Sequence, residues 1–364
     1  MKQCMATAAL AACTTLAAGN AAAQGGVTIY GILDAAIDYN TNVDAAGHSR
    51  VWMPDPGGGM FPSRLGFKGT EDLGGGLKAI FALENGFGID TGANGQNRLF
   101  GRQAWVGLAG GWGQLTLGRN YNMVYNSMFD VDLVGPSNYG LGAIDPAIPN
   151  GRSDNSVAYK GTFDRFTIGA TYSLGRDTSA AGGPSGTNCA GEQGADAQAC
   201  REWSAMLRYD APSWGLVGAY DRVRGGAGAA AGLVRSDLTD SRMNVGGYLK
   251  LGAWKLAAGT LVRNNEGALA TPRSNLYYLE AAYRIAANIT IDGEIARLDY
   301  RDSINDTNQG MVRAMLDLSK RTTAYVAAGH IANHGTAAIA LSAGSKVAAG
   351  QSQSGVMVGV KHAF

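Results

Sequence analysis

The sequence has few charged residues and no long apolar run outside its first residues. Charged residues make up 16% of the 364 residues, whereas an average soluble domain has about a quarter. Beyond the N-terminal region no run of about eighteen apolar residues occurs, which excludes a helical membrane protein. The net charge of +1 gives no indication of a nucleic-acid partner. Glycine is abundant, with 54 residues. Abundant glycine together with few charged residues is typical of a β protein whose outer surface does not face water.

Histidine is also scarce, and the four histidines do not form a site. His330 and His334 have a spacing that binds metal on a helix, but on a strand they would lie about 13 Å apart. The glycine runs lie in turns and lack the lysine and following helix of a phosphate-binding loop. No Ser/His/Asp arrangement appears either. We therefore expect no enzyme, no metal site and no cofactor.

Two of the four cysteines lie in residues 1–23, which have the features of a secretory signal peptide. An alanine-rich apolar run follows Lys2, and the small residues 21–23 form a cleavage site. A lipoprotein cleavage box ending at Cys13 is the alternative. The mature chain would then be residues 24–364, outside the cytoplasm. Export favours a disulfide between Cys189 and Cys200, and two free thiols remain the other possibility.

Apolar and polar residues alternate along most of the mature chain. In residues 27–40, Ile29 and Ile37 fall on odd positions, whereas Asp34 and Asp38 fall on even ones. Such alternation predicts a strand with one apolar and one polar face. The same pattern predicts sixteen strands, near residues 27–40, 63–71, 77–87, 99–109, 114–121, 154–162, 165–175, 202–211, 214–224, 242–251, 254–264, 275–285, 289–300, 309–319, 322–333 and 353–364.

Short turns and long loops alternate between these strands. Transmembrane β-barrels have short turns on one side and longer loops on the other, and about sixteen strands enclose an aqueous lumen. Three tryptophans, Trp112, Trp214 and Trp254, lie beside short turns, where a membrane interface favours aromatic residues. The last strand alternates up to Phe364, and pairing of the first strand with the last would remove the sheet edges. We therefore predict an all-β, sixteen-stranded antiparallel transmembrane barrel.

Residues 122–154 interrupt this regular pattern. No strand or helix period is maintained there, and long irregular segments in compact proteins are usually functional or disordered. The segment contains Met123, Val124, Met128, Ile144 and Ile148, which makes it too apolar for a solvated linker. We therefore expect it to pack against another part of the protein.

The chain resembles the general trimeric porins of Gram-negative outer membranes, in the branch typical of beta-proteobacteria. The resemblance covers the whole mature chain. It is carried by VTIYGILDAAIDY at 27–39, SRLGFKGTEDLGGGLKAIFALENGF at 63–87, GRQAWVGLAGGWGQLTLGRNY at 101–121, DNSVAYKG at 154–161 and VGVKHAF at 358–364.

The resemblance implies an outer-membrane channel for small hydrophilic solutes and ions, assembled as a homotrimer. Outer-membrane lipid, lipopolysaccharide and the outer-membrane assembly machinery would be its other partners, and Phe364 resembles the family's assembly signal. In such porins the third long loop folds into the barrel and narrows the pore, and here that loop is residues 122–154. The loop motif Pro-Glu-Phe-Gly-Gly of many enterobacterial members is absent, and residues 134–138 read Val-Gly-Pro-Ser-Asn instead.

The same resemblance implies which charged residues form the constriction. By position in the motifs, the basic wall would consist of Arg64, Arg102 and Arg152, and strand parity adds Lys68. The acidic residues of the loop that face this wall would be Asp130, Asp132 and Asp145. Arg119 would anchor the root of the loop.

Opposed charges in a water-filled lumen set up a transverse field that orients polar solutes and biases ion passage. Each arginine could instead be an ordinary solvated charge of the lumen or rim. The preference for anions or cations stays open, as does the choice between a general pore and one selective for an anion or a particular metabolite. A secreted β-sandwich adhesin is the non-channel alternative, and it requires apolar strand faces that turn inward.

Overall fold

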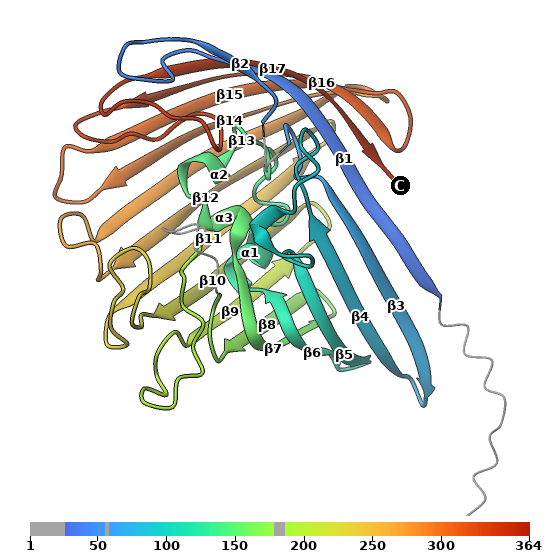
Figure 1. Ribbon diagram of the computed structural model, residues 1–364. Coiled ribbons are helices and arrows are strands. Elements are labelled where there is room, and N and C mark those ends of the chain that lie inside the picture. The colour runs from blue at the N-terminus through green and yellow to red at the C-terminus, as the bar shows by residue number, and fades with distance from the viewer. Residues whose placement is uncertain (1–25, 55–57, 178–185) are drawn as a thin grey trace, which may run out of the picture.

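The described chain folds into one antiparallel sheet that closes into a barrel (Figure 1). The computed structural model describes residues 26–54, 58–177 and 186–364, so the expected signal peptide at 1–23 lies outside the described residues. The sheet has 17 strands, of which β2 is only three residues long, and the other sixteen form the barrel. The strands are β1 (Val27–Asn40), β2 (Arg50–Trp52), β3 (Arg64–Gly74), β4 (Leu77–Gly86), β5 (Gln103–Gly110), β6 (Gly113–Tyr121), β7 (Arg152–Phe163), β8 (Phe166–Ser173), β9 (Glu202–Asp210), β10 (Trp214–Arg224), β11 (Thr239–Leu251), β12 (Trp254–Asn265), β13 (Arg273–Ala286), β14 (Ile289–Tyr300), β15 (Asp306–Asp317), β16 (Thr322–Asn333) and β17 (Gln353–Ala363).

The barrel closes because β1 pairs with a neighbour on each side. Residues 32–40 of β1 pair with β17, and residues 27–32 pair with β3. Every barrel strand therefore has a partner on both sides, which a sheet needs in lipid because unpaired backbone groups have no water to bind. The sixteen-stranded fold and the pairing of the first strand with the last, both predicted from the sequence, are confirmed.

Side chains alternate between the outer surface and the lumen. On β1, Ile29 and Ile37 are 59% and 57% exposed, whereas Asp34 and Asp38 are fully buried. The apolar face therefore points outward and the polar face inward, as in transmembrane barrels. This arrangement is the opposite of the one that a secreted β-sandwich adhesin requires.

Aromatic residues gather beside the short turns. Trp112 stacks on Tyr159, and Trp254 packs against Tyr283 with ring centroids 4.5 Å apart. Amphipathic rings favour the level of the lipid headgroups. These pairs mark the short-turn end of the barrel as one membrane boundary.

The segment after β6 folds into the barrel as three short helices (Figure 1). These are α1 (Met123–Met128), α2 (Leu141–Ile144) and α3 (Ala147–Asn150). Their four to six residues are too few to show a helical period in the sequence, and they were not predicted. A further short helix, η1 (Gly95–Asn97), lies in the preceding long loop. Among the described residues no helix is both long and apolar enough to span a membrane.

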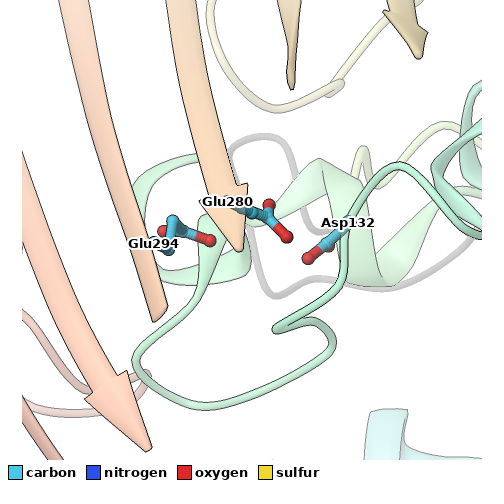
Figure 2. A group of neighbouring side chains, drawn as sticks. All are labelled: Asp132, Glu280 and Glu294. Carbon is cyan, nitrogen blue, oxygen red and sulfur yellow. The ribbon is translucent and has the colours of Figure 1, made fainter. Parts of the chain in front are cut away.

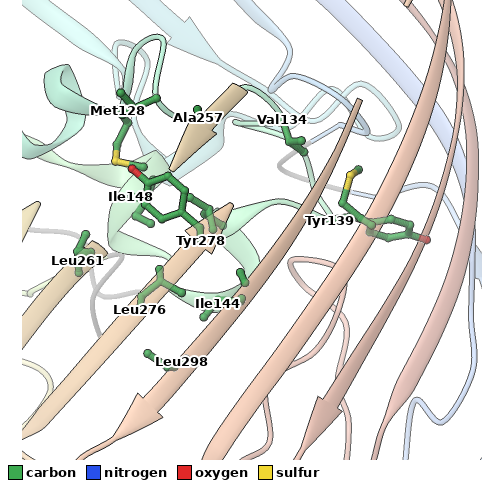
Figure 3. Packing of buried hydrophobic residues seen from close by; sticks show 14 of the residues in the cluster. Met128, Val134, Tyr139, Ile144, Ile148, Ala257, Leu261, Leu276, Tyr278 and Leu298 are labelled. Carbon is green, nitrogen blue, oxygen red and sulfur yellow. The ribbon is translucent and has the colours of Figure 1, made fainter. Parts of the chain in front are cut away.

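The apolar residues of this segment form a core against the barrel wall. Met128, Ile144 and Ile148 are at most 6% exposed, and Figure 3 shows them beside Leu261 and Leu276 of the wall. Packing of apolar side chains removes their surface from water, which stabilises the folded state by about 25 cal/mol for each Å² buried. The expectation that residues 122–154 pack against another part of the protein is confirmed, and β7 begins at Arg152, inside the expected segment.

Candidate functional site

A charged group holds the base of the inward-folded segment. Arg119, near the end of β6, donates from Nη1 to Asp154 Oδ1 (2.6 Å) and from Nε to the Gly101 carbonyl oxygen (2.7 Å). Asp154, on β7, also accepts a hydrogen bond from Arg98 (2.8 Å). Because Arg119 lies just before the segment and Asp154 is its last residue, the pair joins its two ends. Arg119 therefore occupies the place that a loop anchor would need.

Arg102 lies just before β5 and is paired with a carboxylate on β4. Its Nε lies 2.6 Å from Glu84 Oε1, and its Nη2 donates to the Tyr121 hydroxyl (3.1 Å). The second carboxylate oxygen of Glu84 accepts from the Tyr30 hydroxyl (2.9 Å). Arg102 is 6% exposed, so most of its surface is used for contacts within the protein.

Arg152, at the start of β7, lies beside the same group. Its guanidinium carbon is 5.0 Å from the ring centre of Tyr121 and 5.9 Å from that of Tyr125, within the range of a cation–π contact. Its Nε donates to the carbonyl oxygen of Arg102 (3.2 Å). Arg152 is 1% exposed and also donates to the Pro149 carbonyl oxygen in α3 (3.0 Å), so it is buried between the wall and the inward-folded segment.

Arg64 and Lys68 are more accessible. Arg64, at the start of β3, is partly exposed, interacts electrostatically with Arg102 and Glu84, and has an Nε without a hydrogen-bond partner among the described residues. Lys68 is exposed and lies 5.2 Å from the ring centre of Tyr30. The structure thus brings Arg64, Arg102 and Arg152 together, with Glu84 as the carboxylate among them.

Asp130 lies on a different part of the wall. Its carboxylate accepts hydrogen bonds from Arg208 of β9 (2.7 Å) and Lys255 of β12 (2.8 Å), and it is about half exposed. Burial alone would raise the pKa of Asp130, but the hydrogen bonds from Lys255 and Arg208 outweigh it and lower that pKa below its usual value. Lys255 and Arg208 also lie within 6 Å of the ring centre of Tyr248.

Asp145 pairs with the wall behind α2. Its Oδ2 lies 3.2 Å from Arg242 Nε on β11, and its Oδ1 accepts the Ala147 amide (3.0 Å). Arg242 also pairs with Asp240 (3.1 Å), which in turn pairs with Arg263 (2.8 Å). This buried network attaches the segment to β11 and β12.

Asp132 lies among carboxylates and forms no ion pair with a basic side chain of the described residues. Its carboxylate oxygens are within 4.8 Å of those of Glu280 and Glu294. Burial raises the pKa of Asp132 to about 6, although the Gly135 amide and the nearby Arg313 oppose the shift.

The loop acids make their contacts on another part of the wall than the one that holds Arg64, Arg102 and Arg152, and that they face these arginines across the pore stays a prediction. Asp130, Asp132 and Asp145 each contact another part of the wall, because basic or acidic side chains of β9 and β11–β14 project inward there. The carboxylate that Arg102 contacts is Glu84, from the wall itself. The partners of the loop acids are therefore the residues that sequence reasoning missed: Arg208, Lys255, Arg242, Glu280 and Glu294.

Cavities lie on both sides of the segment. A cavity of about 620 Å³ at the long-loop end is lined by Asp145, Arg263 and Tyr300. Another of about 260 Å³ at the short-turn end is lined by Gln114 and Lys160. The inward-folded segment thus lies between open spaces at the two ends of the barrel.

Two further expected features lie away from this region. Cys189 and Cys200 form a disulfide with their Cα atoms 5.2 Å apart, in the long loop between β8 and β9. Phe364 exchanges two backbone hydrogen bonds with Gly31 of β1 (3.2 and 3.1 Å). Its ring is 43% exposed, so it lies on the outer surface where the first and last strands meet.

Comparison with known proteins agrees with this architecture. A family model described as Gram-negative porin matches residues 6–336. The chain is 30% identical over 363 residues to outer membrane porin protein 32 of Delftia acidovorans, covering 96% of this chain and 97% of the relative. It is 35% identical over 259 residues to an outer membrane porin protein of Bordetella pertussis, covering 66% and 64% of the two chains.

Among solved structures, the anion-selective porin from Comamonas acidovorans superimposes with a TM-score of 0.74 at 25% identity. The alignment covers 94% of this chain and 100% of that one. The closed barrel, the inward-folded segment and these matches lead to one assignment. The chain belongs to the Gram-negative porin family and is a β-barrel channel of the outer membrane.

Proposed function

We propose that this porin passes small hydrophilic solutes and ions by passive diffusion, with a preference for anions. The observation that carries the preference is the local charge at the wall formed by β3–β5 and the start of β7. Arg64, Arg102 and Arg152 gather there, and Glu84 is the carboxylate that pairs with Arg102. Rings of basic side chains favour anions in a pore.

The placement of the loop acids supports this charge balance. Asp132 and Asp145 contact the wall on the other side of the lumen and do not neutralise the arginines. In a lumen with low-dielectric walls such an uncompensated charge acts over several ångströms. The field at Arg64 therefore favours anions over cations.

A second basic group lies nearer the short-turn end. Lys250, Lys255 and Arg208 surround the ring of Tyr248 at 5.1, 5.2 and 5.9 Å. Asp130 pairs with Arg208 and Lys255, and Asp210 pairs with Arg208 as well, so two carboxylates lie beside three basic side chains. An anion that passes the inward-folded segment would thus meet positive charge again before it leaves the barrel.

The proposal includes several features that follow from the family. We infer a homotrimer in a lipid and lipopolysaccharide environment, an export signal at residues 1–23 and an assembly role for Phe364. Arg119 would hold the base of the constriction through Asp154. The proposed function involves diffusion alone and no catalytic step.

Recording from purified protein in planar bilayers tests the proposal. Discrete conductance steps are expected in symmetrical potassium chloride, and a membrane without steps at high protein concentration would refute the channel. Under a salt gradient, the zero-current potential should have the sign of a pore that is more permeable to anions than to cations. A potential of the opposite sign would refute the anion preference while leaving the channel itself intact.

A further inference from the structure

Three carboxylates meet where the inward-folded segment contacts the wall. Asp132 comes from the segment, Glu280 from β13 and Glu294 from β14, and their oxygens all lie within 4.8 Å of one another. Figure 2 shows the Glu280 carboxylate between those of Asp132 and Glu294. Glu280 and Glu294 are direct cross-strand neighbours, and like charges in that position repel each other.

No basic side chain among the described residues forms an ion pair with this cluster. Arg313 is the nearby cation, but its guanidinium is held by both carboxylate oxygens of Asp292, at 3.1 and 2.6 Å. Glu280 and Glu294 are only 1% and 3% exposed, so water screens them weakly. Buried charges in proteins are usually paired or bound to a metal.

The cluster also has buried oxygen atoms without a partner. Glu280 Oε2 accepts from the amides of Leu133 and Val134, and Glu294 Oε1 accepts from Gln309 Nε2 (3.0 Å). The Leu141 amide also interacts with the Glu294 carboxylate, while Glu280 Oε1 and Glu294 Oε2 are buried without a well-aligned donor among the described residues. The hydrogen bonds fix both carboxylates, which leaves these free oxygens held in place.

A neutral oxygen ligand lies beside the carboxylates as well. Gln309, on β15, is 4% exposed, and its amide nitrogen is used by Glu294 and the Tyr139 carbonyl. Its amide oxygen is buried without a donor. An amide oxygen is a ligand that calcium accepts, and Gln309 is held beside Glu294 by the hydrogen bond from its amide nitrogen.

We propose that Asp132, Glu280 and Glu294 bind one calcium ion. Calcium takes oxygen ligands at about 2.3–2.6 Å, so one ion can bridge oxygens about 4.6–5.2 Å apart. Magnesium binds at about 2.0–2.1 Å and spans only about 4.2 Å without movement of the ligands. One oxygen from each of the three carboxylates lies within 4.8 Å of the others, a spacing that one calcium ion can bridge. Carboxylates with an amide oxygen nearby match the ligand preference of calcium.

The ion would attach the inward-folded segment to the wall. Asp132 is its ligand on the segment, and two adjacent strands supply the others, so binding would connect the middle of the segment to β13 and β14. The attachments at Arg119 and Asp145 lie nearer the ends of the segment. In the channel proposed above, on which this consequence rests, calcium would reduce fluctuation of the pore.

Calorimetric titration of calcium into the refolded protein in detergent tests the site itself. Refolding from inclusion bodies avoids lipopolysaccharide, which carries its own cation sites, and a chelator removes calcium beforehand. The expected result is one saturable site per chain, with magnesium bound at least about tenfold more weakly. Absence of saturable calcium binding up to millimolar concentration would overturn the proposal, and would mean that protons alone neutralise the cluster.

Variants locate the site. Asp132→Asn and Glu280→Gln should each weaken calcium binding by about tenfold or more, whereas Asp130→Asn, two residues away in the segment, should leave it unchanged. Equal binding by the wild type and both cluster variants would place the ion elsewhere and refute the assignment. A change in gel mobility on heating checks that each variant is folded. The number of calcium ions bound per wild-type chain tests the site without any variant.

Channel recording separates this site from the proposed function. A chelator should increase the current noise of the wild type and leave that of Glu280→Gln unchanged. Channels that conduct but bind no calcium would refute the site alone. Protein that binds calcium but never conducts would refute the channel and leave the site standing.

Discussion

Replacing Arg64 with glutamine should weaken the anion preference at low salt. Arg64 is the most accessible of the three clustered arginines, and its Nε has no hydrogen-bond partner among the described residues. The substitution therefore removes a lumen charge without taking a partner from that nitrogen. Arg102 and Glu84 keep their ion pair.

The size of the effect follows from the distance and the salt. A unit charge about 8 Å from a passing ion contributes about 0.5 kcal/mol in water, and a Debye length of about 10 Å at 0.1 M salt reduces this by roughly half. The arginine stabilises an anion by as much as it destabilises a cation. Its loss should therefore lower the ratio of anion to cation permeability roughly twofold. At about 1 M salt the Debye length is about 3 Å, and the effect should nearly disappear.

The assay is the zero-current potential of Arg64→Gln at these two salt levels, compared with that of Arg165→Gln. Arg165 is an exposed arginine in the short turn after β7. Its replacement therefore removes the same charge from a position that lies away from the constriction. An unchanged permeability ratio at low salt would show that Arg64 does not act on passing ions. An equal change at high salt would show that the substitution altered the shape of the pore instead.

Three further predictions concern the loops. Reduction and alkylation should add two labels to Cys189 and Cys200 while conductance stays unchanged, because the disulfide lies in an outer loop; a large conductance change would contradict that placement. Asp145→Asn and Arg242→Met, combined in a double-mutant cycle of denaturant unfolding, should show a coupling of about 1–3 kcal/mol, and strict additivity would argue against the buried pair. Asp130→Asn should raise the anion preference at pH 7, because Lys255 loses its carboxylate partner while Arg208 keeps only Asp210. In the wild type the same rise is expected only as the pH falls below the usual aspartate range, because the pKa of Asp130 is lowered; a rise near neutral pH would contradict this.

The barrel could be predicted from the sequence because its pattern is local. Alternation such as that of Ile37 and Asp38 can be recognised from neighbouring residues alone. The outer face must be apolar wherever lipid contacts it. The inward position of residues 122–154 followed from apolar content and family resemblance together. The three-residue strand β2 and helices α1–α3 were missed because segments so short show no period.

The partners of the loop acids could not be predicted in the same way. Almost every inward-facing position of a porin strand is polar, so parity alone does not distinguish Glu280 or Arg208 from other lumen residues. Asp132 and Glu280 are separated by more than a hundred residues, and their contact depends on where the segment lies in the barrel. The resemblance placed Arg64 and Arg102 on one wall, but it did not indicate which residues Asp132 and Asp145 contact.

The most direct test of the account is whether the inward-folded segment lines the conducting path. Phe129 follows α1, is 55% exposed and borders the cavity at the short-turn end. In Phe129→Cys, a small sulfonate-bearing thiol reagent should lower the current of open channels in a discrete step. The same labelling of Leu269→Cys, which is 92% exposed in an outer loop, should leave the current unchanged. Complete labelling of Phe129→Cys, shown by mass, with no change in current would contradict a segment that narrows the pore.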